Sequence, residues 1–543
     1  MIFLSTLLLA LLITITMTPL LSMLAVHFKV AVDLPGERKV HTLPVPRIGG
    51  IAMTVGAFVP LLYWLRADHF VTAYLAAATI LVAFGVLDDV LDIPPKFKFL
   101  GQIIAALLVM IGGDVQIRSL GMLLPDGVLL PEFVAVPLTL LAIVGATNAI
   151  NLSDGLDGLA GGICLLIFAS IGCLAYLEGN QNIGLIALAL SGVLFGFLRF
   201  NTHPASIFMG DAGSQFLGFS AASLSIYLTQ TTPTLSPVLP LILLGFPVLD
   251  TLTVMITRIS KGRSPFNADK NHFHHHLMSL GLHHAESVLV IYLFQTLLII
   301  SALLFRYQSD WLLLLEYLGF SAAILLFFHW ARKEEWKAQR IDFIEVFVAE
   351  RFRLLKSKGT AIKRTFPVFV YGISLLLLST CFMAREVPHY LIAAAAPLLV
   401  TIGLVWCFAR QWLGRTLRMT IYLFVPFTVY LSETASHRWL DGTLHTLYNS
   451  LFGIFAVLIL VISKFSRRTS GFKSSPMDFL IIILAVAVPN LPNNNVLDYQ
   501  YGLVAAKVIM LYFSFEVLLA EQRGKYTVIA GTIMLSLLVL VTR

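Results

Sequence analysis

The chain has 543 residues, of which 58% are hydrophobic and only 12% charged, and its net charge is +7. A soluble protein of this length cannot bury so much apolar surface, so the composition excludes a soluble globular protein and predicts a polytopic membrane protein. The basic residues are not gathered in a soluble domain with interleaved aromatic side chains, which excludes nucleic acid as a partner. The four cysteines lie in apolar segments without CxxC spacing, and from them we expect neither disulfides nor a zinc site.

Apolar segments long enough to cross a bilayer recur along the chain, and we count about eighteen of them. About eleven lie in residues 1–330 and about seven in residues 366–543. The first, from Ile2 to about Val26, has no basic start and no cleavage site, so we expect a retained helix and not a signal peptide. The predicted fold is therefore all-α, a polytopic transmembrane helical protein.

Lysine and arginine are distributed unevenly between the loops of the first half. If the N-terminus lies outside, most of them fall on the cytoplasmic side, where basic residues are enriched in membrane proteins. The clusters of polar residues in this half, which are described below, are separated by even numbers of apolar segments. All of them are therefore predicted to lie on that same side. The sequence thus predicts a multi-pass protein of the inner (cytoplasmic) membrane, with its N-terminus outside and its catalytic loops in the cytoplasm.

An acidic motif, Asp88-Asp89-Val90-Leu91-Asp92, ends an apolar segment just before Pro94-Pro95. At helical spacing Asp88 and Asp92 share a face, and Asp89 lies about 100° around the helix. Three carboxylates at a membrane surface repel one another unless a cation or a proton offsets their charge. One aspartate could act as a general base and another could orient a metal or a lysine. An ordinary solvated loop is the alternative.

A second motif places Asn148, Asn151, Asp154 and Asp157 three residues apart, roughly on one helical face. Their hard oxygen atoms suit Mg²⁺, which takes few protein ligands beside substrate phosphates. A structural turn rich in Asn and Asp is the alternative.

The next motif, Gly210-Asp211-Ala212-Gly213-Ser214, opens another apolar segment. Ser214 could cap this helix, and the helix N-terminus would favour a phosphate. Asp211 would repel that phosphate unless a divalent cation lay between them. A role for Asp211 as a helix cap is the alternative.

Residues 258–277 combine basic residues with histidines. Three basic side chains could bind a diphosphate: Arg258, Arg263 and Lys270. Three histidines could donate hydrogen bonds to phosphate oxygens or ligate a transition metal: His272, His274 and His275. The Asp and Asn residues of the other motifs favour the phosphate contacts. The first loop, residues 36–50, adds further basic groups, among them Lys39 and His41.

Residues 331–365 are predicted to form a basic cytoplasmic linker, whose centre, 341–348, could be an amphipathic helix on the membrane surface or a plain charged connector. Residues 366–543 form a C-terminal membrane extension whose function the sequence does not reveal. A lipid or glycan transporter or flippase is the competing interpretation, chiefly for this half. A docking module for a polymerase or glycosyltransferase is another.

Five ordered motifs together resemble the polyprenyl-phosphate N-acetylhexosamine-1-phosphate transferases (glycosyltransferase family 4). They are ERKVH…PVPRIGG, DDVLD, NAINLSDGLDGLAGG, FMGDAGS and GRSPFNADKNHFHHHL, within about residues 1–320. The resemblance implies transfer of N-acetylhexosamine 1-phosphate, with GlcNAc 1-phosphate favoured, from a UDP-sugar to undecaprenyl phosphate. UMP would leave, and the product would initiate a lipid-linked cell-surface glycan.

The resemblance also implies roles for the motif residues. Asp88 would be the base or the phosphate-orienting carboxylate, with Asp89 its partner. Asp211 would be the principal Mg²⁺ ligand, with Asn151 near the same ion and Mn²⁺ as a substitute. The remaining positions would bind substrate: Lys39, His41, Asn148, Asp154, Asp157, Arg258, Arg263, His272, His274 and His275. Direct in-line attack is the preferred route, and a phospho-aspartate on Asp88 or Asp89 is the alternative.

The partners implied are a UDP-N-acetylhexosamine, undecaprenyl phosphate and membrane lipid. A second copy of the chain and downstream glycosyltransferases are candidate protein partners.

Overall fold

The computed structural model describes residues 2–33, 44–125, 127–262, 272–337, 360–384, 387–436, 447–455, 458, 501–522 and 526–542. The chain divides into two compact units, Met1–Gln339 (unit 1) and Arg340–Arg543 (unit 2). The division lies inside the predicted linker, although helix extends into that range from both sides, to Lys333 and from Thr360. The amphipathic helix considered for residues 341–348 lies outside the described residues.

Unit 1 is built mainly from helices. They are α1 (Ile2–Phe28), α2 (Gly49–Trp64), α3 (His69–Leu91), α4 (Pro95–Gly112), η1 (Gly121–Leu123), α5 (Glu132–Ser153), α6 (Leu159–Leu177), α7 (Gln181–Asn201), α8 (Gly210–Thr231), α9 (Leu239–Leu243), α10 (Gly245–Ser260), α11 (Phe273–Ser279), α12 (His284–Leu304) and α13 (Asp310–Lys333). A two-stranded antiparallel sheet, β1 (Val32–Asp33) with β2 (Val45–Pro46), is a small exception to the all-helical expectation.

Ten helices in the described residues are long and apolar enough to cross a membrane, namely α1, α3, α4, α5, α6, α7, α12, α13, α15 and α16. A helix satisfies its own backbone hydrogen bonds, which is what a chain segment needs in lipid. The all-helical, polytopic class is therefore confirmed. The predicted total of about eighteen segments also counts stretches outside the described residues.

The centre of unit 1 is formed by α6 and α7, whose apolar segments are 83% and 78% buried, against 28% for α1 and α13. Helix α8 is also enclosed, although its buried residues include polar ones such as Gln215, Ser220 and Ser223. It packs against α2, α3 and α5. The surroundings of α8 matter because its first turn carries Asp211.

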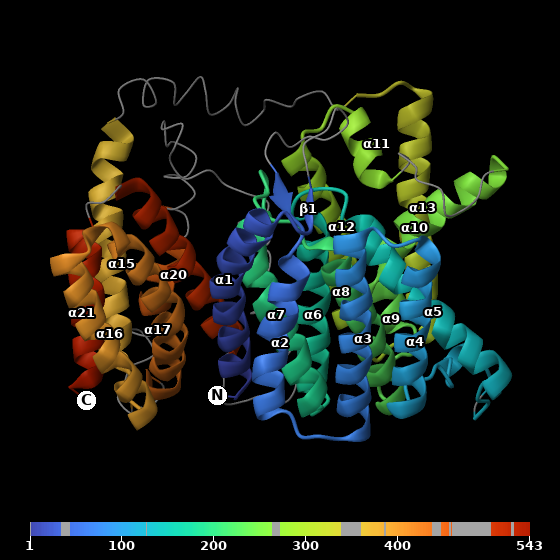
Figure 1. Ribbon diagram of the computed structural model, residues 1–543, viewed down its shortest axis with the longest axis horizontal. Coiled ribbons are helices and arrows are strands. Elements are labelled where there is room, and N and C mark those ends of the chain that lie inside the picture. The colour runs from blue at the N-terminus through green and yellow to red at the C-terminus, as the bar shows by residue number, and fades with distance from the viewer. Residues whose placement is uncertain are drawn as a thin grey trace. The chain divides into compact units, whose positions relative to one another are not determined.

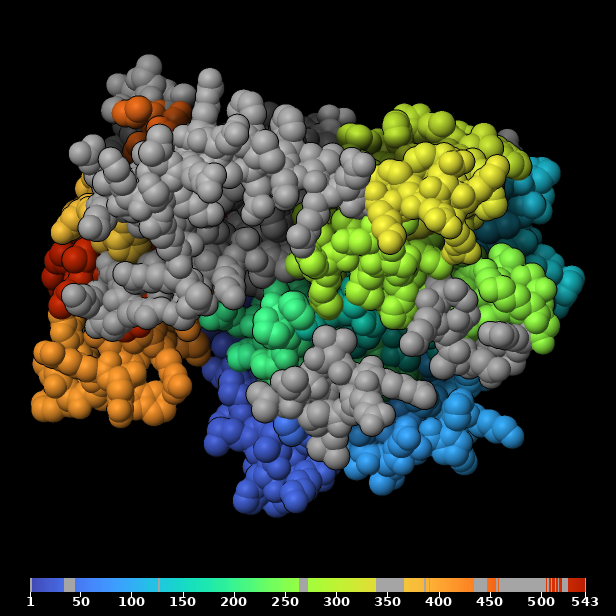
Figure 2. All heavy atoms as spheres, turned by 90° about the horizontal axis from the view of Figure 1, so that it is seen from above, coloured from blue at the N-terminus to red at the C-terminus, as the bar shows by residue number. Residues whose placement is uncertain are grey.

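The polar motifs gather at one end of unit 1. Helix α1 runs from the N-terminus at one end to β1 at the other, where α11 also lies (Figure 1). Figure 2 looks onto this end and shows blue, green and yellow segments of unit 1 on one face, so early and late parts of the unit contribute to it.

Unit 2 contains α15 (Thr360–Met383), α16 (His389–Phe408), η2 (Arg410–Trp412), α17 (Leu413–Ser436), α20 (Tyr501–Gln522) and α21 (Thr527–Val541). Its described helices enclose an ion pair that the sequence analysis did not anticipate. Lys507 of α20 contacts Glu433 of α17, both are buried, and the ammonium lies 4.3 Å from the centre of the Tyr448 ring. A charge pair inside an apolar bundle is costly, so its two members stabilise each other.

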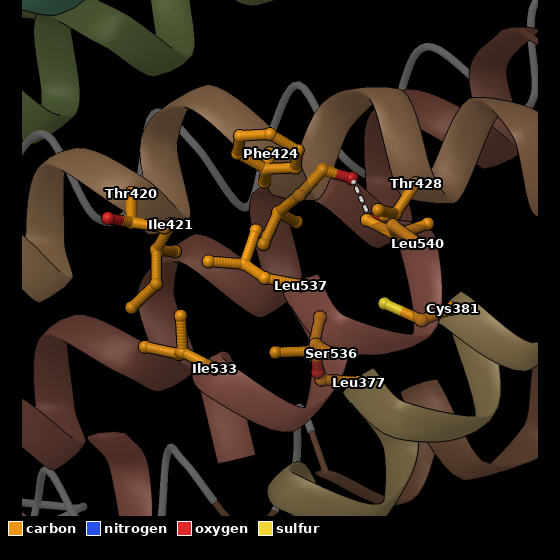
Figure 3. Close-up of a pocket in the computed structure, with 11 residues that line it drawn as sticks. Leu377, Cys381, Thr420, Ile421, Phe424, Thr428, Ile533, Ser536, Leu537 and Leu540 are labelled. Carbon is orange, nitrogen blue, oxygen red and sulfur yellow. Dashed lines mark hydrogen bonds between the residues drawn. The ribbon is translucent and has the colours of Figure 1, made fainter. Parts of the chain in front are cut away.

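A small cavity lies between α15, α17 and α21 (Figure 3). Its lining is mainly apolar, with Thr420, Thr428, Ser536 and Cys381 as the polar exceptions, and Thr428 donates its hydroxyl hydrogen to the carbonyl of Val425. The volume of about 20 Å³ holds about one water molecule. This cavity is too small for a lipid or sugar substrate.

Candidate active site

The end of α3 and the start of α8 meet in backbone contact. A Cβ atom on Gly85 would lie 2.4 Å from the Cα of Ala212, so only glycine permits this approach. The contact lies one turn before Asp88 and next to Asp211. It joins two motifs that are more than a hundred residues apart in the sequence.

Asp89 caps the first turn of α8. Its Oδ1 accepts a hydrogen bond from the backbone N–H of Asp211 at 2.9 Å, and its Oδ2 accepts one from Ala212 at 3.1 Å. Gly210 has a left-handed backbone (φ 68°), and a Cβ there would lie 2.4 Å from Oδ2 of Asp89. A carboxylate at a helix N-terminus is stabilised by the exposed N–H groups and the helix dipole.

This arrangement corrects two predictions. The N-terminus of α8, which the sequence seemed to offer to a phosphate, is occupied by the carboxylate of Asp89. Ser214 does not cap the helix but donates its hydroxyl hydrogen to Oδ1 of Asn151 at 2.7 Å. That bond ties the end of α5 to α8.

Asp88 and Asp211 share one lysine. The Lys98 ammonium lies 2.5 Å from Oδ2 of Asp88 and 2.8 Å from Oδ2 of Asp211. Asp88 is 6% exposed, and its Oδ1 has no hydrogen-bond partner among the described residues. A buried carboxylate oxygen without a partner is costly, and it is available to accept a hydrogen bond or a cation. Asp92, by contrast, is exposed at the end of α3 and takes no part.

From the sequence, Lys98 was only one of the basic residues expected on the cytoplasmic side of the membrane. A signal was present, because this lysine stands in the first turn of an apolar helix, where an ammonium needs a partner.

A layer of amides lies beside the carboxylates. Asn148 donates to Oε1 of Gln102 at 2.7 Å, and Gln102 donates to Oε1 of Gln215 at 3.1 Å. These bonds link α5, α4 and α8. The side chain of Asn148 thus has a structural partner, and neither glutamine was identified from the sequence.

Asp154 lies just beyond the end of α5, so the predicted helical face stops at Asn151. Burial, together with the negative charges of Asp211, Asp157 and Asp89, raises the pKa of Asp154 to about 7. Among the described residues, the cluster holds four carboxylates and one ammonium, that of Lys98, which contacts Asp88 and Asp211; Arg47 acts from farther away and is paired with Asp33 at 2.7 Å. This excess of negative charge and the free Oδ1 of Asp88 fit a divalent cation with oxygen ligands.

The histidine segment is anchored by a residue that the sequence analysis missed. Asp250, 4% exposed on α10, lies 2.8 Å from Nδ1 of His272 and accepts a 2.8 Å hydrogen bond from the backbone N–H of Phe273. His272 is itself only 6% exposed. This internal pair occupies Nδ1 and holds the start of α11, and the predicted contact of His272 with substrate stays a prediction.

His274 is the histidine that reaches the loop after α5. A Cβ on Gly155 would lie 2.7 Å from Cε1 of its ring. Burial, and the neighbouring ring of His275 at 4.2 Å, lower the pKa of His274 to about 4, so its imidazole is neutral at neutral pH. A neutral imidazole can donate one hydrogen bond and accept another.

The remaining predicted residues have other partners or lie outside the described residues. Asp157 is near enough to Asp154 for its charge to raise the pKa of Asp154, and its Oδ2 lies 2.7 Å from Nδ1 of His203. Arg258 is buried in the last turn of α10. Lys39, His41, Arg263 and Lys270 lie outside the described residues. The structure therefore brings together Asp88, Asp89, Asn151, Asp154 and Asp211, with His274 against the same loop.

The chain is similar to known proteins over its first part. The family described as Glycosyl transferase family 4 matches residues 71–229. The chain is 40% identical over 307 residues to the probable undecaprenyl-phosphate N-acetylglucosaminyl 1-phosphate transferase of Bacillus subtilis (strain 168). The aligned region covers 56% of this chain and 85% of the relative. It is 32% identical over 337 residues to the undecaprenyl-phosphate alpha-N-acetylglucosaminyl 1-phosphate transferase of Yersinia pestis, with 60% of this chain and 90% of the relative aligned. It is 30% identical over 320 residues to the enzyme of the same name from Escherichia coli (strain K12), with 57% of this chain and 85% of the relative aligned.

Proposed function

The chain belongs to glycosyl transferase family 4, among the undecaprenyl-phosphate N-acetylglucosaminyl 1-phosphate transferases, and on this premise we propose its full reaction. An oxygen of undecaprenyl phosphate attacks the β-phosphorus of UDP-GlcNAc. The bond between that phosphorus and the bridging oxygen breaks, and UMP leaves with the bridging oxygen. The product is undecaprenyl-pyrophosphoryl-GlcNAc, which would begin a lipid-linked cell-surface glycan.

The observation that carries this proposal is the group formed by Asp88, Lys98 and Asp211 at the end of the bundle. The reaction brings together two phosphate groups that repel each other. The ammonium is fixed in position between two carboxylates, and the remaining negative charge of the group favours a divalent cation. The ammonium and that cation together would offset the phosphate charges without having to reorganise.

We propose that Mg²⁺ binds at this group. Asp211 and Asn151 are the predicted ligands, and the free Oδ1 of Asp88 and the carboxylate of Asp154 are further oxygen donors in the cluster. When bound, the ion supplies positive charge that neutralises the phosphate oxygens.

The two adjacent aspartates have different tasks in this proposal. Asp88 has an oxygen free to orient the lipid phosphate and to accept its proton. Both oxygens of Asp89 already accept hydrogen bonds from α8, so this carboxylate anchors Asp211. This difference favours direct attack by the lipid phosphate. A phospho-aspartate route, if used, would involve Asp88.

We also propose that the site faces the cytoplasm of a cell whose inner membrane holds the protein. Figure 1 shows the N-terminus at the end of α1 away from β1, and β2, the partner of β1, bonds to the segment that leads to Asp211, since Phe208 donates its N–H to the carbonyl of Pro46. The nucleotide sugar would arrive from water, and the polyprenyl chain would stay in the bilayer beside the apolar helices.

The test compares Asp88→Asn, Asp211→Asn and Asp92→Asn in the purified full chain with UDP-GlcNAc, undecaprenyl phosphate and Mg²⁺. Asp92 is the matched control because it is an exposed aspartate one turn from Asp88. We expect a loss of at least about 100-fold for the first two variants and a rate near that of the unmodified chain for Asp92→Asn.

Two results would contradict the proposal. One is the absence of UMP release from any UDP-N-acetylhexosamine by folded protein. The other is a normal rate for Asp211→Asn at low Mg²⁺.

A further inference from the structure

A second cluster of potential ligands lies next to the active-site loop, and none of its members is assigned a step in the reaction proposed above. Its members are Asp157, His203 and His284. One ligand atom from each lies within 4.8 Å of the others. They come from three segments, since Asp157 precedes α6, His203 follows α7, and His284 begins α12.

The ligand atoms face one another. Oδ2 of Asp157 lies 2.7 Å from Nδ1 of His203 and also accepts the backbone N–H of Ala205 at 3.0 Å. Nε2 of His284 accepts the backbone N–H of Asp157 at 3.2 Å, so this nitrogen carries no proton, and an ion bound to it would displace that hydrogen bond. The two imidazole rings stack with centroids 4.3 Å apart.

The backbone that carries this cluster is held by buried hydrogen bonds. The N–H of Gly158 donates to Oδ1 of Asn201 at 2.9 Å, and the hydroxyl of Tyr292 donates to the carbonyl of Gly158 at 2.6 Å. Asn201 and Tyr292 belong to α7 and α12, the helices next to His203 and His284. The three ligands are thus positioned by contacts that do not depend on an ion.

Two imidazoles and one carboxylate form a ligand set typical of zinc and related transition metals. Mg²⁺ prefers oxygen donors, so the carboxylate cluster around Asp88 has a different preference. We propose that Asp157, His203 and His284 bind a divalent transition metal, with Zn²⁺ the best fit, at a site separate from the catalytic group.

A bound ion would take the place of the direct contact between His203 and Asp157, and the proton on Nδ1 of His203 would move to Nε2 or to solvent. It would also link three loops. Asp157 lies three residues after Asp154, and His203 lies in the loop that leads to Asp211. The metal would therefore restrain both segments that carry carboxylates to the active site, and it would stabilise the folded protein by binding that state.

The test uses Co²⁺, whose visible absorption reports its coordination, on the purified full chain after chelator treatment. We expect a tetrahedral-type spectrum that Zn²⁺ abolishes, and a rise in the thermal unfolding temperature with Zn²⁺. His203→Ala and His284→Ala should each weaken binding at least about 100-fold, because losing a direct ligand costs more than the 10- to 100-fold loss seen for outer partners.

Two controls separate this site from other histidines. His69→Ala removes an exposed histidine at the start of α3 and should leave the spectrum unchanged. His274→Ala tests the histidines of α11 and should also leave it unchanged.

The proposal is overturned if Co²⁺ gives no such spectrum. It is equally overturned if the spectrum survives in the His203 and His284 variants but disappears in His274→Ala. His203 is exposed, so its replacement should not prevent folding, and unfolding curves without metal check this. None of these measurements depends on transferase activity.

Discussion

Replacing Asp89 with asparagine separates an anchoring role from a catalytic one. The carboxylate accepts two hydrogen bonds from the first turn of α8, at 2.9 and 3.1 Å. Asparagine offers one oxygen, and its amide group would face the second N–H. The change removes one charge-assisted bond, worth about 1.5–3 kcal/mol. Since asparagine is also a good helix cap, we expect a net loss of about 1–2 kcal/mol in the free energy of unfolding.

The assay pairs thermal unfolding in detergent with the initial rate of UMP release, for Asp89→Asn and Asp88→Asn side by side. We expect the unfolding temperature of Asp89→Asn to be a few degrees lower than that of the unmodified chain. Its rate of UMP release should fall about 10-fold, because Asp211 is displaced. Asp88→Asn should lose at least about 100-fold in rate. If Asp89→Asn unfolds at the normal temperature but is as inactive as Asp88→Asn, then Asp89 takes part in the chemistry and the anchoring role is wrong.

Three further outcomes are expected. Lys98→Gln should lower the rate at least about 100-fold, because it removes the charge shared by two carboxylates, and a rate near normal would exclude Lys98 from the site. Asp250→Asn should raise the KM for UDP-GlcNAc more than it lowers kcat, since it loosens the start of α11, and steady-state kinetics with KM unchanged would contradict this. Because the pKa of Asp154 is raised in the folded protein, protonation of this carboxyl group stabilises the folded, metal-free state. The contribution is complete when the pH is below the ordinary pKa of 3.8, and it is lost as the pH rises through about 7. Unfolding temperatures measured without Mg²⁺ should therefore fall between pH 6 and pH 8, and Asp154→Asn should make this fall smaller, since the other carboxylates of the cluster remain; an unchanged slope in the variant would assign the fall to those other groups.

Local patterns in the sequence are enough to predict the class of the protein and the motifs of its candidate site. Long apolar segments specify membrane helices because lipid leaves the backbone no other partner. The motifs at Asp88, Asn151 and Asp211 stand at the ends of such segments, and an even number of crossings brings segment ends to one side. These are local properties of the chain, so a single sequence contains them.

Only the tertiary structure decided which side chain has which task. Asp88 and Asp89 are neighbours in the sequence, yet one has a free oxygen and the other caps α8. Likewise Lys98 and Asp250 belong to no polar motif of the sequence, and their importance comes from partners 113 and 22 residues away. Such roles depend on how each helix is rotated and where distant helices pack against it. Residue type and spacing within a motif do not contain that information.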